Sequence, residues 1–244
     1  MPSDYQYLKS ERVRIKFFIG VILRLINAAW PLLILLTAFL EAAPFSPYFN
    51  KNICSQVIDK DVFVICYDYN YKAAKAVAYT LHGDKVGKSI KKRPRFYPEP
   101  SLRASNRAVY KDYTHSGYDR GHLANDADFD YSPTALNQTY SLANIVPQAP
   151  VVNRRQWTKA EKYERMMAIK LGSVNVLNIV SYSSSPKRIG DNGIAVPDAF
   201  WKMISNDQEG FSRCFFYTNT LDAVAKGDKL KAHAVDCKTL PLPK

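Results

Sequence analysis

The sequence is poor in cysteine and has no short cysteine spacing. It holds four cysteines in 244 residues, and no two of them form a Cys-x-x-Cys pair, which argues against a zinc ribbon. We find no internal repeat and no low-complexity segment. The architecture must therefore come from an ordinary hydrophobic core, and the even cysteine count leaves room for two disulfides.

Acidic residues are scarce relative to basic ones. The chain has 22 Asp and Glu against 34 Lys and Arg, a formal net charge of +12. This balance favours a polyanionic partner, either nucleic acid or an anionic membrane surface, although a solvated basic surface is the simpler alternative. Hydrophobic residues make up 47%, which excludes a disordered chain and allows one sizeable domain with an appendage.

The appendage is the N-terminal stretch, residues 1–43. A polar start with several basic residues precedes a mostly apolar run at 17–40, and Ala42 and Ala43 follow as small residues suited to signal cleavage. The run is also long enough to span a bilayer, with Arg24 inside it. The basic start places the N-terminus in the cytoplasm and the rest outside.

Two locations follow from this stretch. A cleaved signal predicts a periplasmic or secreted protein, and a retained span predicts an anchor in the inner membrane that faces outward. A buried soluble helix is the third interpretation. In an oxidising compartment we expect the disulfides Cys54–Cys66 and Cys214–Cys237, with buried free thiols as the alternative.

The remainder, residues 44–244, reads as one α+β domain. A helix is predicted over 159–171, where good helix formers run without a breaker up to Gly172. Apolar, β-branched segments before and after it predict strands. Strands at both ends with a helix between them favour the α+β class. The predicted strands cover 62–67, 75–81, 174–182 and 214–217.

Residues with chemical potential gather between Tyr118 and Glu161. Asp119-Arg120-Gly121-His122 opens the segment, Leu142-Ala143-Asn144-Ile145-Val146-Pro147 continues it, and Asn153-Arg154-Arg155-Gln156-Trp157 closes it, with Glu161 beyond. In this order and spacing the pieces resemble the DNA/RNA non-specific endonucleases, the ββα-metal or His-Me finger nucleases that include endonuclease G. The resemblance covers about 91–203 and implies a ββα-metal core with a mixed or antiparallel sheet flanked by helices. It also implies a later strand at 194–204.

His122 is the candidate general base. A neutral imidazole accepts a proton near physiological pH, and the resemblance implies that His122 deprotonates the attacking water. The alternative for a single histidine is a satisfied structural residue.

Asn153 and Glu161 are the candidate metal residues. The amide oxygen of Asn153 is a hard ligand suited to Mg²⁺, with Mn²⁺ as a substitute, and the resemblance implies direct ligation. Asn153 with Gln156 also reads as a capping box at a helix start. Glu161 lies eight residues later, and the resemblance implies that it holds metal-bound water. The alternative is an exposed glutamate paired with Arg165.

A basic segment precedes the motifs. Residues 85–95 are rich in lysine and arginine, and nearby prolines exclude a regular helix, so the segment is either a solvated loop or an arm that contacts phosphate. The family carries an arginine upstream, followed by an aromatic and an acidic residue. Arg93 is our preferred match, and Arg95 is kept in reserve.

Two further motif residues complete the candidate site. Asn144 matches a family asparagine that shapes the site, or it only forms a turn. Arg120 faces phosphate, or it pairs with Asp119. Asp126 and Asp128 depart from the family pattern and either recruit a second cation or cap a turn.

Together these observations predict an exported, Mg²⁺-dependent, sugar-non-specific endonuclease. It would cleave single- or double-stranded DNA and RNA to products with 5′ phosphates, as the resemblance implies. A catalytically idle nucleic-acid-binding protein on the same fold is one rival. A basic protein that is associated with the membrane through residues 17–40 is the other. The sequence leaves the oligomeric state open.

Overall fold

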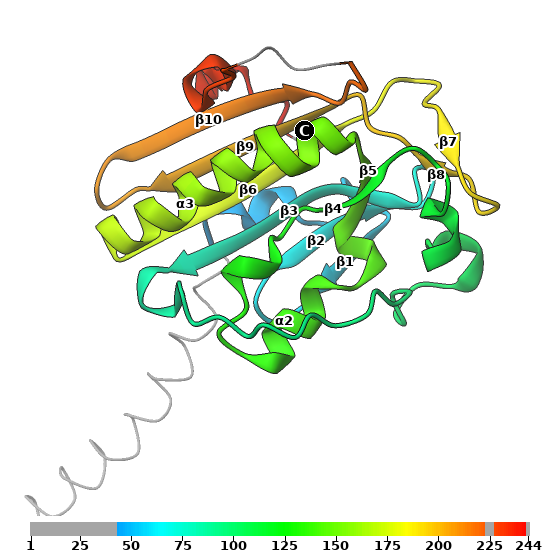
Figure 1. Ribbon diagram of the computed structural model, residues 1–244, viewed down its shortest axis with the longest axis horizontal. Coiled ribbons are helices and arrows are strands. Elements are labelled where there is room, and N and C mark those ends of the chain that lie inside the picture. The colour runs from blue at the N-terminus through cyan, green and yellow to red at the C-terminus, as the bar shows by residue number, and fades with distance from the viewer. Residues whose placement is uncertain (1–42, 223–226, 243–244) are drawn as a thin grey trace, which may run out of the picture. The chain divides into compact units, whose positions relative to one another are not determined.

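A computed structural model describes residues 43–222 and 227–242 of the chain (Figure 1). The predicted signal or anchor at 17–40 lies outside these residues. Among the residues described, no helix combines the length and the apolar character that a membrane crossing requires.

Seven strands form one sheet, in the order β1-β2-β3-β6-β9-β10-β11. Every neighbouring pair in it is antiparallel. All four predicted strand segments are strands of this sheet. The strands are β1 (Gln56–Asp59), β2 (Val64–Asp68), β3 (Ala73–His82), β6 (Ser173–Ser181), β9 (Ala199–Asn206), β10 (Phe211–Thr218) and β11 (Ala234–Val235).

Both faces of the sheet are buried, because alternate side chains enter two separate cores. On β3, Val77 and Tyr79 enter the larger core, while Ala76 and Ala78 enter the smaller one. The 3₁₀ turns η1 (Ala43–Tyr48) and η9 (Cys237–Thr239) lie at the smaller core, to which Phe45 and Cys237 contribute. Two-sided burial explains why β3 and β6 read as nearly continuous apolar runs.

The predicted later strand at 194–204 is divided in the structure. Ile194–Ala195 forms β8, which pairs with β7 (Arg188–Ile189) in a small separate ribbon, and β9 begins only at Ala199. Pro197 lies in the interruption. Because proline has no N–H to donate to a ladder, a strand does not run through it at this position.

A ββα unit packs on the larger core. β4 (Asp119–His122) and β5 (Ile145–Gln148) pair antiparallel, with His122 opposite Ile145. The chain then turns into a π-helical segment, η7 (Val152–Trp157), which continues as α3 (Thr158–Leu171). Figure 1 shows α3 lying along the face of the sheet, where it contacts β3, β6 and β9. The ββα core and the α+β class expected from the sequence are confirmed.

The connection from β4 to β5 consists of three short helical segments. They are η5 (Asp126–Asp128), α2 (Pro133–Thr139) and η6 (Leu142–Asn144). Ser132 caps α2 by accepting a hydrogen bond from Ala135 N, and Pro133 occupies its first turn, as is typical of helix starts. This connection returns the chain to the side of His122 and so places α2 and η6 near the site.

Both predicted disulfides are present. Cys54 pairs with Cys66, with 5.1 Å between their Cα atoms, and Cys214 pairs with Cys237 across 5.2 Å. The first joins the segment before β1 to β2, and the second joins the C-terminal segment to β10. Both contribute to the smaller core.

Removal of the second disulfide should destabilise the protein without unfolding it. We expect Cys214→Ala with Cys237→Ala to lower the free energy of unfolding by about 2–4 kcal/mol, because the unfolded chain regains loop entropy. Urea unfolding measures the loss. Added reductant should then destabilise the wild type more than this variant, which has one bridge fewer to lose. Four titratable thiols in the native wild type would contradict the assignment.

Candidate active site

His122 ends β4 in an aromatic enclosure. Its ring centre lies 5.5 Å from that of Phe96 and 5.0 Å from that of Tyr140. The residue keeps some exposed surface, but its Nε2 atom is shielded and has no hydrogen-bond partner among the described residues. Burial lowers the pKa of His122 to about 4, against an opposing effect of Asp126 and with a further lowering by Arg93. The imidazole is therefore neutral at physiological pH.

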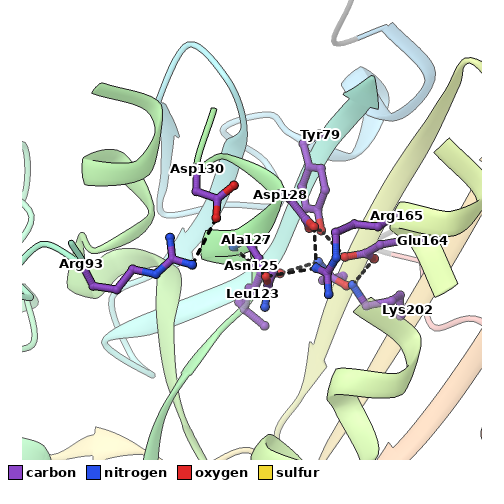
Figure 2. A network of polar contacts seen from close by, with 11 residues as sticks. Tyr79, Arg93, Leu123, Asn125, Ala127, Asp128, Asp130, Glu164, Arg165 and Lys202 are labelled. Atoms are coloured by element: carbon purple, nitrogen blue, oxygen red, sulfur yellow. Dashed lines mark hydrogen bonds and ion pairs between the residues drawn. The ribbon is translucent and has the colours of Figure 1, made fainter. Parts of the chain in front are cut away.

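Arg93 lies beside His122, held by two carboxylates. Its Nε is 3.3 Å from Asp126 Oδ2 and its Nη2 is 3.1 Å from Asp130 Oδ2, the latter contact drawn in Figure 2. Tyr140 also donates its hydroxyl to Asp126, at 2.8 Å. Roughly a third of the Arg93 side chain, 35%, remains exposed. The guanidinium is thus fixed in place and still reachable by an anion.

Arg95 differs from Arg93 in its surroundings. It is exposed, and it forms no ion pair or hydrogen bond with the residues that the structure describes. The geometry therefore brings Arg93 into the site, as preferred from the sequence.

Arg120 packs against aromatic rings. Its guanidinium carbon is 3.8 Å from the ring centre of Tyr110 and 5.8 Å from that of Phe96, and Nη2 donates to the carbonyl of Tyr110 at 3.3 Å. It does not pair with Asp119, because successive residues of a strand point to opposite sides. Asp119 instead holds Arg154 through two hydrogen bonds of 2.6 and 2.7 Å. The predicted alternative of an Asp119–Arg120 pair is wrong.

Gly121 is required by close packing. Its neighbour in register on β5 is Val146, and the side chain of Gln148 lies over it. A Cβ atom on Gly121 would collide with Gln148. Glycine therefore leaves room for the Gln148 side chain over the residue before His122.

The side-chain amide of Asn144 forms all its hydrogen bonds with backbone atoms. Its Oδ1 accepts from Ala124 N at 2.9 Å, and its Nδ2 donates to the carbonyls of Ala124 and Thr139, both at 2.9 Å. Its own carbonyl accepts from Leu123 N at 3.0 Å. Asn144 therefore positions the chain directly after His122, and of the two predicted roles the geometry favours the shaping one.

Asn153 lies inside the helix and not at its start. Helical structure begins before it, and the segment η7 shows no side-chain cap. The capping box with Gln156 is therefore wrong. The Nδ2 of Asn153 donates to Asp119 Oδ2 at 3.0 Å, which fixes the orientation of the amide, because a carboxylate can only accept. Oδ1 then points away from Asp119 and receives no hydrogen bond from the described residues.

Glu161 is buried, with 5% of its surface exposed. Burial raises its pKa to about 7, Lys202 opposes this and Asp128 adds to it, while a hydrogen bond from Asn125 favours the ionised form. The predicted alternative, an exposed glutamate paired with Arg165, is wrong, because Arg165 binds Asp128 at 2.8 Å. Glu161 therefore faces the loop that follows His122.

The two acids of that loop have separate surroundings. Asp128 is buried and bound by Arg165 and by the Tyr79 hydroxyl, at 2.8 and 3.2 Å, so it is closed to a second cation (Figure 2). Asp126 faces Arg93 and Tyr140. The turn η5 is capped by Asn125, whose Oδ1 accepts from Ala127 N at 2.8 Å. No local sequence pattern places Asp126 with Tyr140 and Phe96, because only the fold brings these residues together.

The donor set fits a hard divalent cation. Within 43–222 and 227–242, no group of three His, Cys, Asp or Glu is arranged to hold a metal. Asn153 Oδ1 is a neutral oxygen that points away from Asp119, which suits an ion that keeps several waters. The helix is hydrogen-bonded to Asp119 through Asn153 and to Asn125 through Glu161. It thus runs alongside β4 and the loop beyond, and His122 lies between these two contacts in the chain.

Known proteins resemble this chain in sequence. The sequence model described as DNA/RNA non-specific endonuclease matches residues 41–238. Endonuclease G, mitochondrial, from Homo sapiens is 31% identical over 167 residues, 64% of this chain and 56% of that protein. Nuclease 1, mitochondrial, from Schizosaccharomyces pombe is 30% identical over 180 residues, 67% of this chain and 56% of that protein. The chain thus spans about half the length of these relatives.

A solved structure is similar in fold. A chain from the crystal structure of the EndoG/EndoGI complex superposes with a TM-score of 0.67 at 22% identity, covering 75% of this chain and 81% of that one. At this identity the likeness supports the fold alone.

The pKa of His122 can be tested directly. We expect the imidazole to titrate near pH 4 in NMR spectra, because burial disfavours its charged form. Asp126→Asn should lower this pKa further, and Arg93→Gln should raise it, since each removes one neighbouring charge. The unfolded chain binds this proton already below about pH 6.5. Stability should therefore fall as the pH drops from about 6.5 to 4. A folded-state pKa near 6.5 would contradict the burial of Nε2.

Proposed function

The chain belongs to the DNA/RNA non-specific endonuclease family, and we propose on this basis that it hydrolyses phosphodiester bonds in DNA and RNA with the help of a divalent metal ion. The observation that carries the proposal is the neutral imidazole of His122, whose shielded Nε2 has no hydrogen-bond partner among the described residues, with the guanidinium of Arg93 beside it. An acceptor for a proton and a cation for phosphate are what this hydrolysis needs next to each other.

Each residue has a distinct part in the proposed reaction. His122 accepts the proton of the attacking water. Arg93 draws the substrate phosphate and offsets the negative charge that grows on it. Asn144 holds the backbone after His122, so that the imidazole keeps its place. Arg120, packed against aromatic rings, adds positive charge on β4, the strand that carries His122.

The metal site is formed by the helix. Asn153 Oδ1 would hold Mg²⁺, with Mn²⁺ as a substitute, and Glu161 would hold a water of its shell. When bound, the ion would stabilise charge on the phosphate and the leaving oxygen, which accords with products carrying 5′ phosphates. The bond from Asn153 Nδ2 to Asp119 supports this role, because it turns the amide oxygen away from Asp119.

We expect broad substrate use. Contacts to phosphate carry no sequence information, and the net charge of +12 favours any polyanion. The proposed substrates are therefore DNA and RNA, single- or double-stranded.

The proposed location is outside the cytoplasm. The two disulfides support it, because such bonds persist in oxidising compartments. Residues 1–43 would act as a signal or as an anchor. Cell fractionation with an antibody to the domain tests this, and recovery from the cytoplasm would rule it out.

Plasmid cleavage tests the activity itself. Purified Pro44–Lys244, one compact unit, should nick and linearise plasmid DNA and degrade RNA with Mg²⁺, and a chelator should stop both reactions. Binding of nucleic acid without cleavage would favour the idle binding protein instead.

Substitutions in the site should separate base from metal. His122→Ala should lower the rate by at least about 10²–10⁴-fold and leave metal affinity intact. Asn153→Ala should raise the Mg²⁺ concentration needed for half-maximal activity. Glu161→Ala should raise the same concentration by a smaller factor, at most about 10–100-fold. Arg155→Ala is the control, because Arg155 is exposed on the same segment and its side chain pairs with none of the described residues, so the Mg²⁺ requirement should stay unchanged. Unchanged metal dependence in Asn153→Ala would exclude it as the ligand.

Salt should weaken the reaction steeply. Binding that releases counterions from phosphate falls with a slope of about 0.9 per contact in log units. Lys92→Ala with Arg95→Ala should reduce the slope by up to about 2 if both touch phosphate. Lys51→Ala with Lys238→Ala removes equal charge from segments beside the smaller core and should leave the slope unchanged. Equal slopes in both double variants would place the substrate elsewhere.

A further inference from the structure

Two fully buried polar side chains stand next to each other in the centre of the sheet. Asn178 on β6 and Lys202 on β9 are direct partners in the antiparallel register, and both are 0% exposed. Directly opposed residues of a strand pair point to the same face, here the face that carries the ββα unit. Burial of an amide and a cation is costly, so their contacts need an explanation.

Asn178 holds the strand that carries the general base. Its Nδ2 donates to the carbonyl of Leu123 at 2.8 Å, and Leu123 follows His122 directly. Asn144 holds Ala124, the next residue, from another side. The backbone just after His122 is therefore fixed to the sheet by Asn178 and to η6 by Asn144.

Lys202 holds the helix that carries the metal residues. Its Nζ lies 2.6 Å from Glu164 Oε2 and 4.7 Å from the ring centre of Trp157. Figure 2 shows the contact with Glu164, which also accepts from Tyr79 at 3.1 Å. Trp157 ends the segment that contains Asn153, and Glu164 lies about one turn after Glu161. One ammonium group thus touches the helix near both metal residues.

We propose that Asn178 and Lys202 are positioning residues that set the placement of His122 relative to the metal-binding helix. This inference rests on the proposed function. Neighbouring strands are about 4.8 Å apart, so the two side chains share one rigid base. A stability role alone does not account for Lys202, because an apolar pair of similar volume is often as stable as a buried ion pair. A shift of about 1 Å at a reacting group can cost about 10²-fold in rate.

Two variants separate the two arms. Asn178→Leu removes the donor at nearly constant volume. We expect kcat to fall by about 10–100-fold, with the Mg²⁺ requirement unchanged and the NMR titration of His122 shifted. Lys202→Met with Glu164→Gln removes both charges of this pair together, so neither member is left without its partner. We expect weaker Mn²⁺ binding in calorimetry, by about tenfold, and a matching rise in the half-activating Mg²⁺ concentration, with the His122 titration unchanged.

Asn206→Leu is the matched control. Asn206 Nδ2 donates to the Ser173 carbonyl at 2.9 Å, a bond of the same kind at the far end of β6. It should lower thermal stability without changing kcat in the folded protein. If Asn178→Leu behaves in the same way, or if both test variants change kcat and metal binding together, the two residues only support the fold. Wild-type protein without nuclease activity would overturn the proposed function, while calorimetry and NMR still test the positioning roles.

Discussion

The arrangement depends on a buried cluster of charges beneath α3. Arg165 binds Asp128, Lys202 binds Glu164, and Tyr79 bridges both carboxylates. The cluster joins the loop after His122, the helix α3 and the sheet, three parts that are distant in sequence. Removing one partner of such a buried pair typically costs about 3–5 kcal/mol. Glu161 is a third acidic residue beside only two basic ones. Burial, together with this excess of negative charge, raises the pKa of Glu161 to about 7. A cation arriving beside Glu161 would relieve the imbalance.

His122 lies outside this cluster, in aromatic surroundings, and the contrast has a chemical consequence. The same burial that lowers its pKa to about 4 makes the imidazole a weaker base, but it also keeps every molecule deprotonated at neutral pH. General-base catalysis depends on both properties, and an optimum lies where their product is largest. Asp126 offsets part of the burial effect and so recovers some basicity, while Arg93 provides the positive charge that the base itself lacks. The aromatic residues Phe96 and Tyr140 contribute to this burial, and Tyr140 also holds Asp126 through its hydroxyl.

The sequence predicted the family, the class of fold, the main strands and both disulfides, because motifs, apolar runs and cysteine spacing are local signals. The wrong predictions concern side chains whose contacts are made by residues far away in the sequence. Asn153 and Gln156 carry a capping pattern, but the helix begins earlier and Asp119 takes up the side chain. Arg93 and Arg95 were nearly equivalent, and carboxylates far along the chain separate them. Asn178 did carry a signal, since a buried amide in an apolar strand requires a partner.

The Asp119–Asn153 bond also explains why an aspartate precedes Arg-Gly-His in the first motif. Arg154 holds both oxygens of Asp119, Asp119 in turn orients the amide of Asn153, and burial competes with these hydrogen bonds, which lower the pKa of Asp119. A partly exposed pair such as Asp119–Arg154 adds little stability. Its contribution is to orientation, because Asp119 leaves the Asn153 amide one orientation, in which Oδ1 of Asn153 is free. The first and last motifs are therefore one hydrogen-bonded unit, and β4 must pass beside the helix for either of them to function.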